Sequence, residues 1–332
     1  MSVATALRWR GGDLAPSLVL PLVALAALPT MSFSTWLTFT IAGIAMGMML
    51  FLMASGLTLI FGLMDVLNFA HGAFVTLGAY VAVSVMAALA GWSAADSWWL
   101  NLAALLVALV AAILASGAAG LLFERIIIRR VYGAHLRQIL VTVGGLIVAE
   151  QLIVALWGAN PLSLPKPASF RGSILLGDVA IETYRIIALL LGLAVYVALH
   201  LVLNRTRIGL LVRAGVENRE MVEALGYRIR RLFVGVFVAG TALAGMGGVM
   251  WGLYQELVTR AIGADMTVLV FIILIIGGLG SVGGCFVGAL LVGLLTNYVG
   301  FLAPKLALGS NILLMAAILL WRPRGLFPVA KE

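Results

Sequence analysis

A long apolar stretch recurs about every thirty residues along this chain, and few charges interrupt it. Stretches of about 18 or more apolar residues indicate helices that cross a membrane, whose hydrocarbon core is about 30 Å thick. Of the 332 residues, 63% are hydrophobic and 10% are charged, whereas about a quarter of the residues in a soluble domain are charged. These features exclude a water-soluble globule and predict a protein that lives in a bilayer.

The apolar stretches predict an all-α, polytopic membrane protein with about ten membrane segments, forming a single transmembrane domain over 1–332. The first segment follows Arg8 and Arg10, so it is either a membrane span or a cleavable signal peptide. The segments are expected near 14–30, 36–63, 70–90, 98–123, 138–157, 184–203, 232–254, 266–280, 284–302 and 307–321.

Two places make the number of full crossings uncertain by sequence. Segment 36–63 is longer than one straight crossing needs, so we expect it to tilt or to break at Gly43, Gly47 or Gly56. The eighth and ninth segments are separated only by 281–283, so one of them is a candidate re-entrant helix. We therefore expect about eight to ten segments, with one or more broken or re-entrant helices.

The positive charges indicate the orientation. With a cytoplasmic N-terminus, ten crossings place 16 of the 21 Lys and Arg residues on the inner side. This predicts that both termini are cytoplasmic. The five positive residues on the outer side are Lys166, Arg171, Arg185, Arg260 and Lys305. The longest outer stretch, about 158–183, is rich in proline and glycine and is predicted to form turns at the surface.

Several functional classes lack the residues they need. The net charge of +8 lies between spans rather than on one surface, which argues against nucleic-acid binding. Cys285 is the only cysteine and the three histidines are isolated, so the sequence predicts no metal and no other cofactor. We find no Ser-His-Asp arrangement, paired carboxylates or HExxH motif, and so expect no catalytic residues. The glycine-rich stretch 277–284 lacks the Lys-Ser/Thr ending of a nucleotide-binding loop.

The polar segment 204–231 lies on the predicted inner side and reads NRTRIGLLVRAGVENREMVEALGYRIRR. Within it, Gly215 to Leu225 predicts a short helix with an apolar face beside a charged one, ending at Gly226. One interpretation is a solvated basic loop; the other is a helix that docks on a soluble partner. The candidate coupling residues are Arg213, Glu217, Arg219, Glu220, Glu223, Ala224 and Gly226.

The segment GLTLIFGLMDVLNFAHGAFVTLGAY places Asp65, Asn68 and His71 within an apolar region. If helical, their spacing puts neighbouring pairs on adjoining parts of one face. They either cap the turn between two spans at the inner interface or form part of a gate. Glu150 is the carboxylate well inside a predicted span, and is either a buried hydrogen-bond partner or a pathway residue.

Glycines in the last third of the chain are expected to allow close helix packing or to act as hinges. The candidates singled out for this role are Gly245, Gly248, Gly278 and Gly280.

These segments, taken in order, resemble the permease subunits of ABC importers for branched-chain amino acids, the LivH-type family. The resemblance rests on the two segments quoted above and on GTALAGMGGVMWGLY, IIGGLGSVGGCFVGALLVGLL and WRPRGLFP, and covers most of the chain from Ile44 onward. Gly226 comes earlier than in the common form of the family's cytoplasmic coupling signature, and the match is less specific in the first forty residues and in 158–183.

The resemblance implies a transport subunit of the bacterial inner membrane that is not itself an enzyme. Its implied partners are a second permease subunit, two cytoplasmic ABC ATPase subunits and an external solute-binding protein that delivers a small solute. Relatives of this type carry branched-chain amino acids, urea, short amides or aromatic carboxylates. The rival from another class is an ion-driven secondary transporter, for which Glu150 and Asp65 would be the ion-site candidates.

Overall fold

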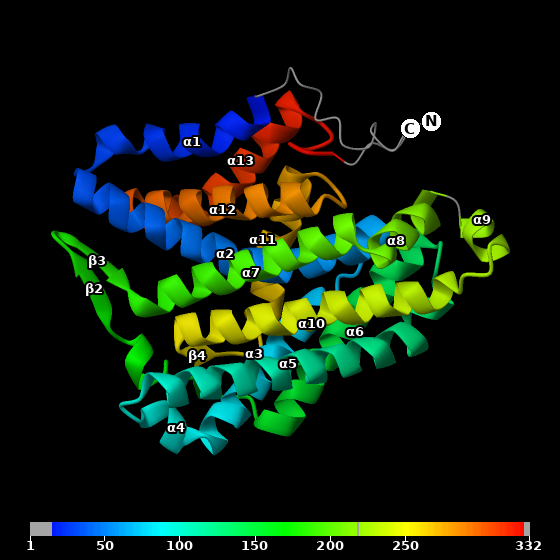
Figure 1. Ribbon diagram of the computed structural model, residues 1–332, viewed down its shortest axis with the longest axis horizontal. Helices are drawn as coiled ribbons and strands as arrows, with labels where there is room; N and C mark the ends of the chain where they lie inside the picture. The colour runs from blue at the N-terminus through cyan, green and yellow to red at the C-terminus, as the bar shows by residue number, and fades with distance from the viewer. Residues whose placement is uncertain (1–14, 218, 329–332) are drawn as a thin grey trace.

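The computed structural model describes residues 15–217 and 219–328, and this part of the chain is a bundle of helices (Figure 1). Eight helices among the described residues are long and apolar enough to cross a membrane. They are α2 (Phe33–Met64), α3 (His71–Ala88), α5 (Trp98–Ile126), α6 (His135–Trp157), α7 (Thr183–Arg205), α10 (Ile229–Gln255), α12 (Val282–Leu302) and α13 (Ala307–Trp321). Helix α13 reaches the length of a span together with the 3-10 turn that precedes it, from Pro304. The predicted all-α polytopic fold is confirmed.

Shorter elements complete the chain. Two apolar helices among the described residues are shorter, α1 (Ala15–Ala26) and α11 (Ile262–Gly277), and with them the number of apolar helices is roughly the ten segments expected. The remaining helices are α4 (Ala90–Ala94), α8 (Arg207–Glu217) and α9 (Arg219–Ala224), with single 3-10 turns η1 (Leu28–Thr30), η2 (Ile128–Arg130), η3 (Ala168–Phe170) and η4 (Pro304–Leu306). The strands are β1 (Leu162–Ser163), β2 (Ser173–Leu176), β3 (Val179–Glu182) and β4 (Leu257–Val258).

Helix α2 is the centre of the bundle and is buried along most of its length, between α12, α10 and α7 (Figure 1). It runs unbroken for 32 residues, about 48 Å, so of the two expected alternatives, a tilt or a break at the glycines, the break does not occur. The glycines serve close packing instead. A Cβ atom on Gly43 would lie 2.8 Å from the Leu294 Cα atom of α12. One on Gly56 would overlap the Gly240 carbonyl oxygen of α10.

The two ends of the bundle differ in what they carry. At one end, called the basic end below, α8 and α9 project beyond the other helices (Figure 1). The α5–α6 loop also lies here, because α5 and α10 are antiparallel and Gly120 packs on Thr241. The opposite end, called the hairpin end, carries α4 and the β2–β3 hairpin (Figure 1).

The segment between α6 and α7 closes the hairpin end. β1 pairs with β4 in antiparallel register, Leu162 opposite Val258. Phe170 is fully buried and meets the Trp98 ring edge-on, with ring centroids 5.2 Å apart. Turns and two short strand pairs form where turns were predicted. Most of this segment is exposed at the surface, but Leu164 and Phe170 are buried against the bundle.

Candidate functional site

The segment at the basic end forms two helices where one was predicted. Helix α8 begins at Arg207, before the expected start at Gly215, because Ile208, Leu211 and Val212 recur at the spacing that gives a helix one apolar face. Helix α9 ends where predicted. Gly226 adopts φ +85°, a left-handed conformation that glycine reaches without strain.

Hydrogen bonds fix the end of α9. The Tyr227 N–H donates to the Val222 carbonyl (3.2 Å) and the Gly226 N–H donates to the Glu223 carbonyl (3.0 Å). This pair of bonds is the Schellman arrangement, which satisfies carbonyls that a helix end would otherwise leave open. The chain therefore turns sharply after α9 and enters α10.

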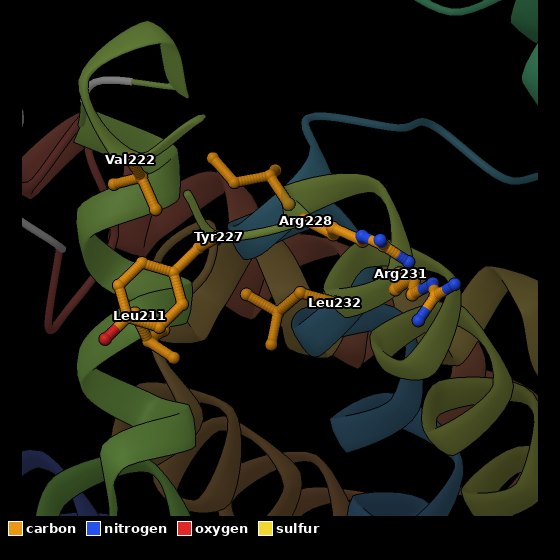
Figure 2. A pocket seen from close by; sticks show the side chains of 7 residues that line it. Leu211, Val222, Tyr227, Arg228, Arg231 and Leu232 are labelled. Atoms are coloured by element: carbon orange, nitrogen blue, oxygen red, sulfur yellow. The ribbon is translucent and has the colours of Figure 1, made fainter. Parts of the chain in front are cut away.

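A few apolar side chains hold this pair of helices to the bundle. Val212, Val222 and Ile229 are buried. Beside them lies a groove of about 310 Å³ with an apolar floor and a basic rim (Figure 2). The lining residues are Leu211, Val222, Tyr227, Arg228, Ile229, Arg231 and Leu232.

The predicted apolar face of α9 is divided between two directions. Val222 points into the bundle, whereas Met221 is 58% and Leu225 69% exposed. Glu223 and Ala224 are also exposed. The side chains of four predicted coupling residues, Arg213, Glu217, Arg219 and Glu220, lie outside the part of the structure that is described.

Asp65 marks the end of α2. It caps the helix with φ 53° in the left-handed region, its side chain is exposed, and its carboxylate lies 3.8 Å from His135 Nε2. The next five residues, 66–70, form no helix. The shared helical face expected for Asp65, Asn68 and His71 therefore does not form.

Instead, the chain turns back into the protein before α3 begins. His71 is the first residue of α3, is fully buried, and its Nε2 lies 2.9 Å from the Met53 carbonyl oxygen. Met53 precedes the end of α2 by 11 residues, so α3 starts about 16 Å inside the bundle. Asn68 is also fully buried, and its Oδ1 accepts the Ala70 N–H (3.1 Å). Asn68 and His71 thus hold an interior break, while Asp65 remains at the surface.

Helix α11 also begins inside the bundle, beside the start of α3. The Gly263 N–H donates to Thr76 Oγ1 (3.0 Å), and a Cβ atom on Gly72 would overlap the Gly263 carbonyl oxygen. Further along, the Phe69 and Phe271 rings stack with centroids 4.8 Å apart. These contacts run antiparallel. From this shared level, α3 leads to the hairpin end and α11 to the basic end.

The four singled-out glycines occur at close backbone contacts. A Cβ atom on Gly245 would overlap the Ser116 hydroxyl of α5, and one on Gly248 would overlap the carbonyl oxygen of Val75 in α3. Gly278 and Gly280 adopt φ +98° and +82° after α11. A Cβ atom on Gly280 would lie 2.8 Å from the Gly62 Cα atom of α2, and one on Gly278 would lie 3.1 Å from the Phe327 carbonyl carbon.

Sequence reasoning found one carboxylate within the helices and missed two. Glu150 lies on α6, half-buried, and no ion pair in the described part of the chain includes it. Glu124 lies within α5 and is buried, and Asp265 lies in the first turn of α11. Both fell one residue outside the expected spans. Helices run past the last apolar residue of a stretch, so extending each span by one turn would have included both.

No group of three or more His, Cys, Asp or Glu side chains in the described part of the chain is placed to hold a metal ion. Within 15–217 and 219–328, the candidate site therefore consists of the helix pair at the basic end and the interior break where α3 and α11 begin.

Comparison with known proteins shows which family this chain resembles. The family described as "Branched-chain amino acid transport system / permease component" matches residues 39–321. The high-affinity branched-chain amino acid transport system permease protein LivH of Escherichia coli (strain K12) is 29% identical over 258 residues, 76% of this chain and 82% of that protein. BraD, the corresponding permease protein of Pseudomonas aeruginosa, is 27% identical over 299 residues, 86% of this chain and 93% of that protein.

A similar protein also occurs in an archaeon. The probable branched-chain amino acid transport permease protein LivH of Methanocaldococcus jannaschii is 27% identical over 291 residues, 84% of this chain and 88% of that protein. No solved structure matches the chain.

Proposed function

This chain belongs to the family of permease components of branched-chain amino acid transport systems, and we propose that it carries branched-chain amino acids inward across the bacterial inner membrane. As a permease component it is a transport subunit rather than an enzyme. Its own sequence has no nucleotide-binding loop, so the energy comes from elsewhere. We assign that role to two cytoplasmic ABC ATPase subunits.

The projecting pair α8–α9 carries the proposal. It extends beyond the bundle at the end where most of the arginines gather, and the positive-inside rule assigns that end to the cytoplasm (Figure 1). Met221 on α9 and Leu225, which directly follows the helix, are four residues apart and both exposed. A short helix with a small apolar face and charged neighbours suits a groove on a soluble ATPase subunit.

The connections of this pair suggest how force reaches the membrane. One residue, Thr206, separates α7 from α8, and 225–228 separate α9 from α10. Helix α10 in turn packs along α2, α3 and α5, with Gly248 against the backbone of α3. Closure of the ATPase subunits would push α8–α9 and tilt α7 and α10, opening the pathway to one side and closing it to the other.

The other partners follow from the same assignment. A second permease subunit, a homologous chain or a second copy, would complete the pathway. An external solute-binding protein would deliver the solute from the outer side of the membrane. Both termini would then lie in the cytoplasm.

Charge reversal at the end of α8 and on α9 tests the coupling. We expect E223K and E217K, in vesicles containing the chain, its ATPase subunits and its partner permease, to retain ATP hydrolysis but to lower solute transport about tenfold. The matched control is D178K, which makes the same change at the exposed tip of the hairpin at the other end. Unchanged transport per ATP hydrolysed in both variants would defeat the assignment.

A second measurement separates the proposal from an ion-driven transporter. Alone in vesicles with an ion gradient, the chain should accumulate no solute, whereas accumulation under these conditions would support the secondary-transporter class. Calorimetric screening of the cognate binding protein against leucine, isoleucine and valine, with urea, short amides and aromatic carboxylates as competitors, identifies the solute.

A further inference from the structure

Besides the buried Glu124 of α5, three charged side chains in the described part of the chain lie within the depth of the helices without an ion pair. Glu150 of α6 is half-buried, and Asp265 of α11 and Arg260, just before it, are exposed. None of the ion pairs found in the described part of the chain includes any of them. Ionised groups at membrane depth are unfavourable against lipid, so they face protein or water.

Glu150 lies well below the hairpin end. Trp157, the last residue of α6, donates from Nε1 to the Ser84 hydroxyl of α3 (2.8 Å), which sets the two helices in register. Ser84 is four residues before the end of α3 at Ala88, and Glu150 is seven residues below Trp157. Glu150 therefore lies about 16 Å beneath the outer end of α3.

Asp265 lies at a similar depth. Gly263 bonds to Thr76 of α3, and Thr76 is 12 residues, about 18 Å, below Ala88. Asp265 follows in the first turn of α11 and is therefore no shallower. Because α11 starts inside the bundle, this carboxylate is held at a depth that a full-length span would have filled with apolar residues.

Arg260 lies between β4 at the hairpin end and the start of α11, so it is nearer to the hairpin end than Asp265. It is within electrostatic range of Tyr80 of α3, which lies about 12 Å below Ala88. The Tyr80 ring also contacts Trp157 of α6, with centroids 5.5 Å apart. Glu150 and Trp157 are seven residues apart, which places them on one face of α6. Helix α3 therefore contacts both α6, the helix that carries Glu150, and the start of α11.

Three backbone N–H groups at the start of α11 already have hydrogen-bond acceptors. The Gly263 N–H bonds to Thr76, the Ile262 N–H to the Thr259 carbonyl, and the Asp265 N–H to the Ala261 carbonyl. The charged groups on this face that remain to bind a solute are therefore the side chains of Glu150, Asp265 and Arg260.

The exposed face of α5 differs from the α6–α3–α11 face. Its shallow groove is lined only by apolar side chains, as a surface against lipid should be. The residues are Leu106, Val107, Val110, Ala111 and Leu114. The α6–α3–α11 face differs in carrying charge of both signs at membrane depth.

We propose that the α6–α3–α11 face lines the solute pathway, with Arg260 receiving the carboxylate and Glu150 and Asp265 the ammonium group of a zwitterionic amino acid. Charge-assisted hydrogen bonds are the strong contacts for both groups. Arg260 meets the solute first, and the two carboxylates meet it deeper. This inference rests on the proposed function for the kind of solute, but not for the location of the pathway.

Thiol labelling tests the location. The only native cysteine, Cys285, is buried, so an added cysteine can be followed alone. In vesicles containing the complete transporter, a small cationic thiosulfonate reagent should modify E150C and D265C at least about tenfold faster than V110C, the control on the outer face of α5. Leucine should slow the first two reactions only. Modification of E150C and D265C as slow as that of V110C would overturn the pathway assignment.

Kinetics test the assigned roles. E150Q and D265N, which keep side-chain size, should raise the KM for leucine transport about tenfold, because each removes a charge-assisted bond, with a smaller change in kcat. D178N at the hairpin tip is the matched control. A thermal unfolding midpoint equal to that of the unmodified chain excludes misfolding. Unchanged KM in both variants would overturn the ammonium assignment.

The two proposals fail differently. If the unmodified complex does not move leucine but E150C and D265C react rapidly, the solute class is wrong and the pathway stands. If leucine is transported with ATP but neither cysteine reacts faster than V110C, the proposed function stands and this inference fails.

Discussion

The two long polar segments of this chain, 158–182 at the hairpin end and 204–231 at the basic end, are held to the bundle in different ways. The outer segment buries Leu164 and Phe170 completely and forms a β-bridge to the segment after α10. Its Lys166 lies 3.2 Å from Glu256 and 3.9 Å from Glu182. Several independent contacts therefore fix it.

The inner segment is held more lightly. Val212 and Val222 are the buried apolar side chains of α8 and α9 among those described, and exposed apolar residues such as Leu225 face away from the bundle. Segments with few buried contacts open locally at low free energy. We therefore expect the outer segment, 158–182, to stay fixed and call it the platform. We expect the inner segment, 204–231, to move and call it the lever.

The largest effect should come from breaking the platform. F170A removes a fully buried ring packed on Trp98 and should lower the free energy of unfolding by about 3 kcal/mol. The thermal unfolding midpoint in detergent should fall by several degrees. V222A on α9 removes less buried area and is the inner counterpart. An equal or greater fall for V222A would contradict the difference between the two segments.

The lever should respond in function rather than in stability. L225D places a charge where the apolar face of α9 would meet the ATPase subunit, so we expect transport to fall about tenfold while the unfolding midpoint stays constant. Leu225 is 69% exposed, which leaves room for the carboxylate without internal strain. L175D, at an exposed position of the outer hairpin, is the control for the charge itself. Full transport by L225D would count against docking through this face.

The ionic contacts of the platform should contribute a smaller amount. The Lys166 side chain is only 11% exposed, but both carboxylates are about half exposed. K166M should therefore destabilise the protein by about 1 kcal/mol at low salt, and by less in high salt. Unfolding midpoints measured at both salt concentrations check this. A loss independent of salt would mean that packing on Tyr184 and Tyr254, rather than charge, holds Lys166.

A matched pair of glycines gives the smallest and sharpest comparison. Gly177 in the outer hairpin and Gly226 after α9 both have positive φ, and neither has a heavy atom within 4 Å of an added Cβ. G177A and G226A should each destabilise the protein by about 1 kcal/mol through backbone strain alone. We expect only G226A to lower transport as well, because it alters the end of the lever. Equal transport by the two variants would argue against this role of the turn.

Much of the fold was predictable because a membrane imposes it. The expected spans agree with the helices to within a few residues, and the helix stop at Gly226 was found from its glycine alone. The resemblance to branched-chain amino acid permeases is confirmed by the family match. These features depend on composition and local chemistry, which the sequence states directly.

The candidate site was less predictable. The residues between Met64 and His71 are mostly apolar, as they would be in a helix, so nothing local shows that the chain breaks and returns into the bundle. The depth of Asp265 depends on where α11 starts, and this is set by the contact of Gly72 with Gly263 in a distant helix. Phe170 lies in a segment whose prolines and glycines suggested only surface turns.

By itself, the sequence determined the solvent, the approximate number of spans and which loops gather positive charge, because each follows from composition along the chain. The tertiary structure decided which apolar faces pack against other helices and where α3 and α11 begin. It also decided which charged side chains at membrane depth have no ion pair among the described residues. The physical reason is that an apolar residue suits a lipid-facing surface and a packed interior equally well. Only contacts between distant helices separate the two.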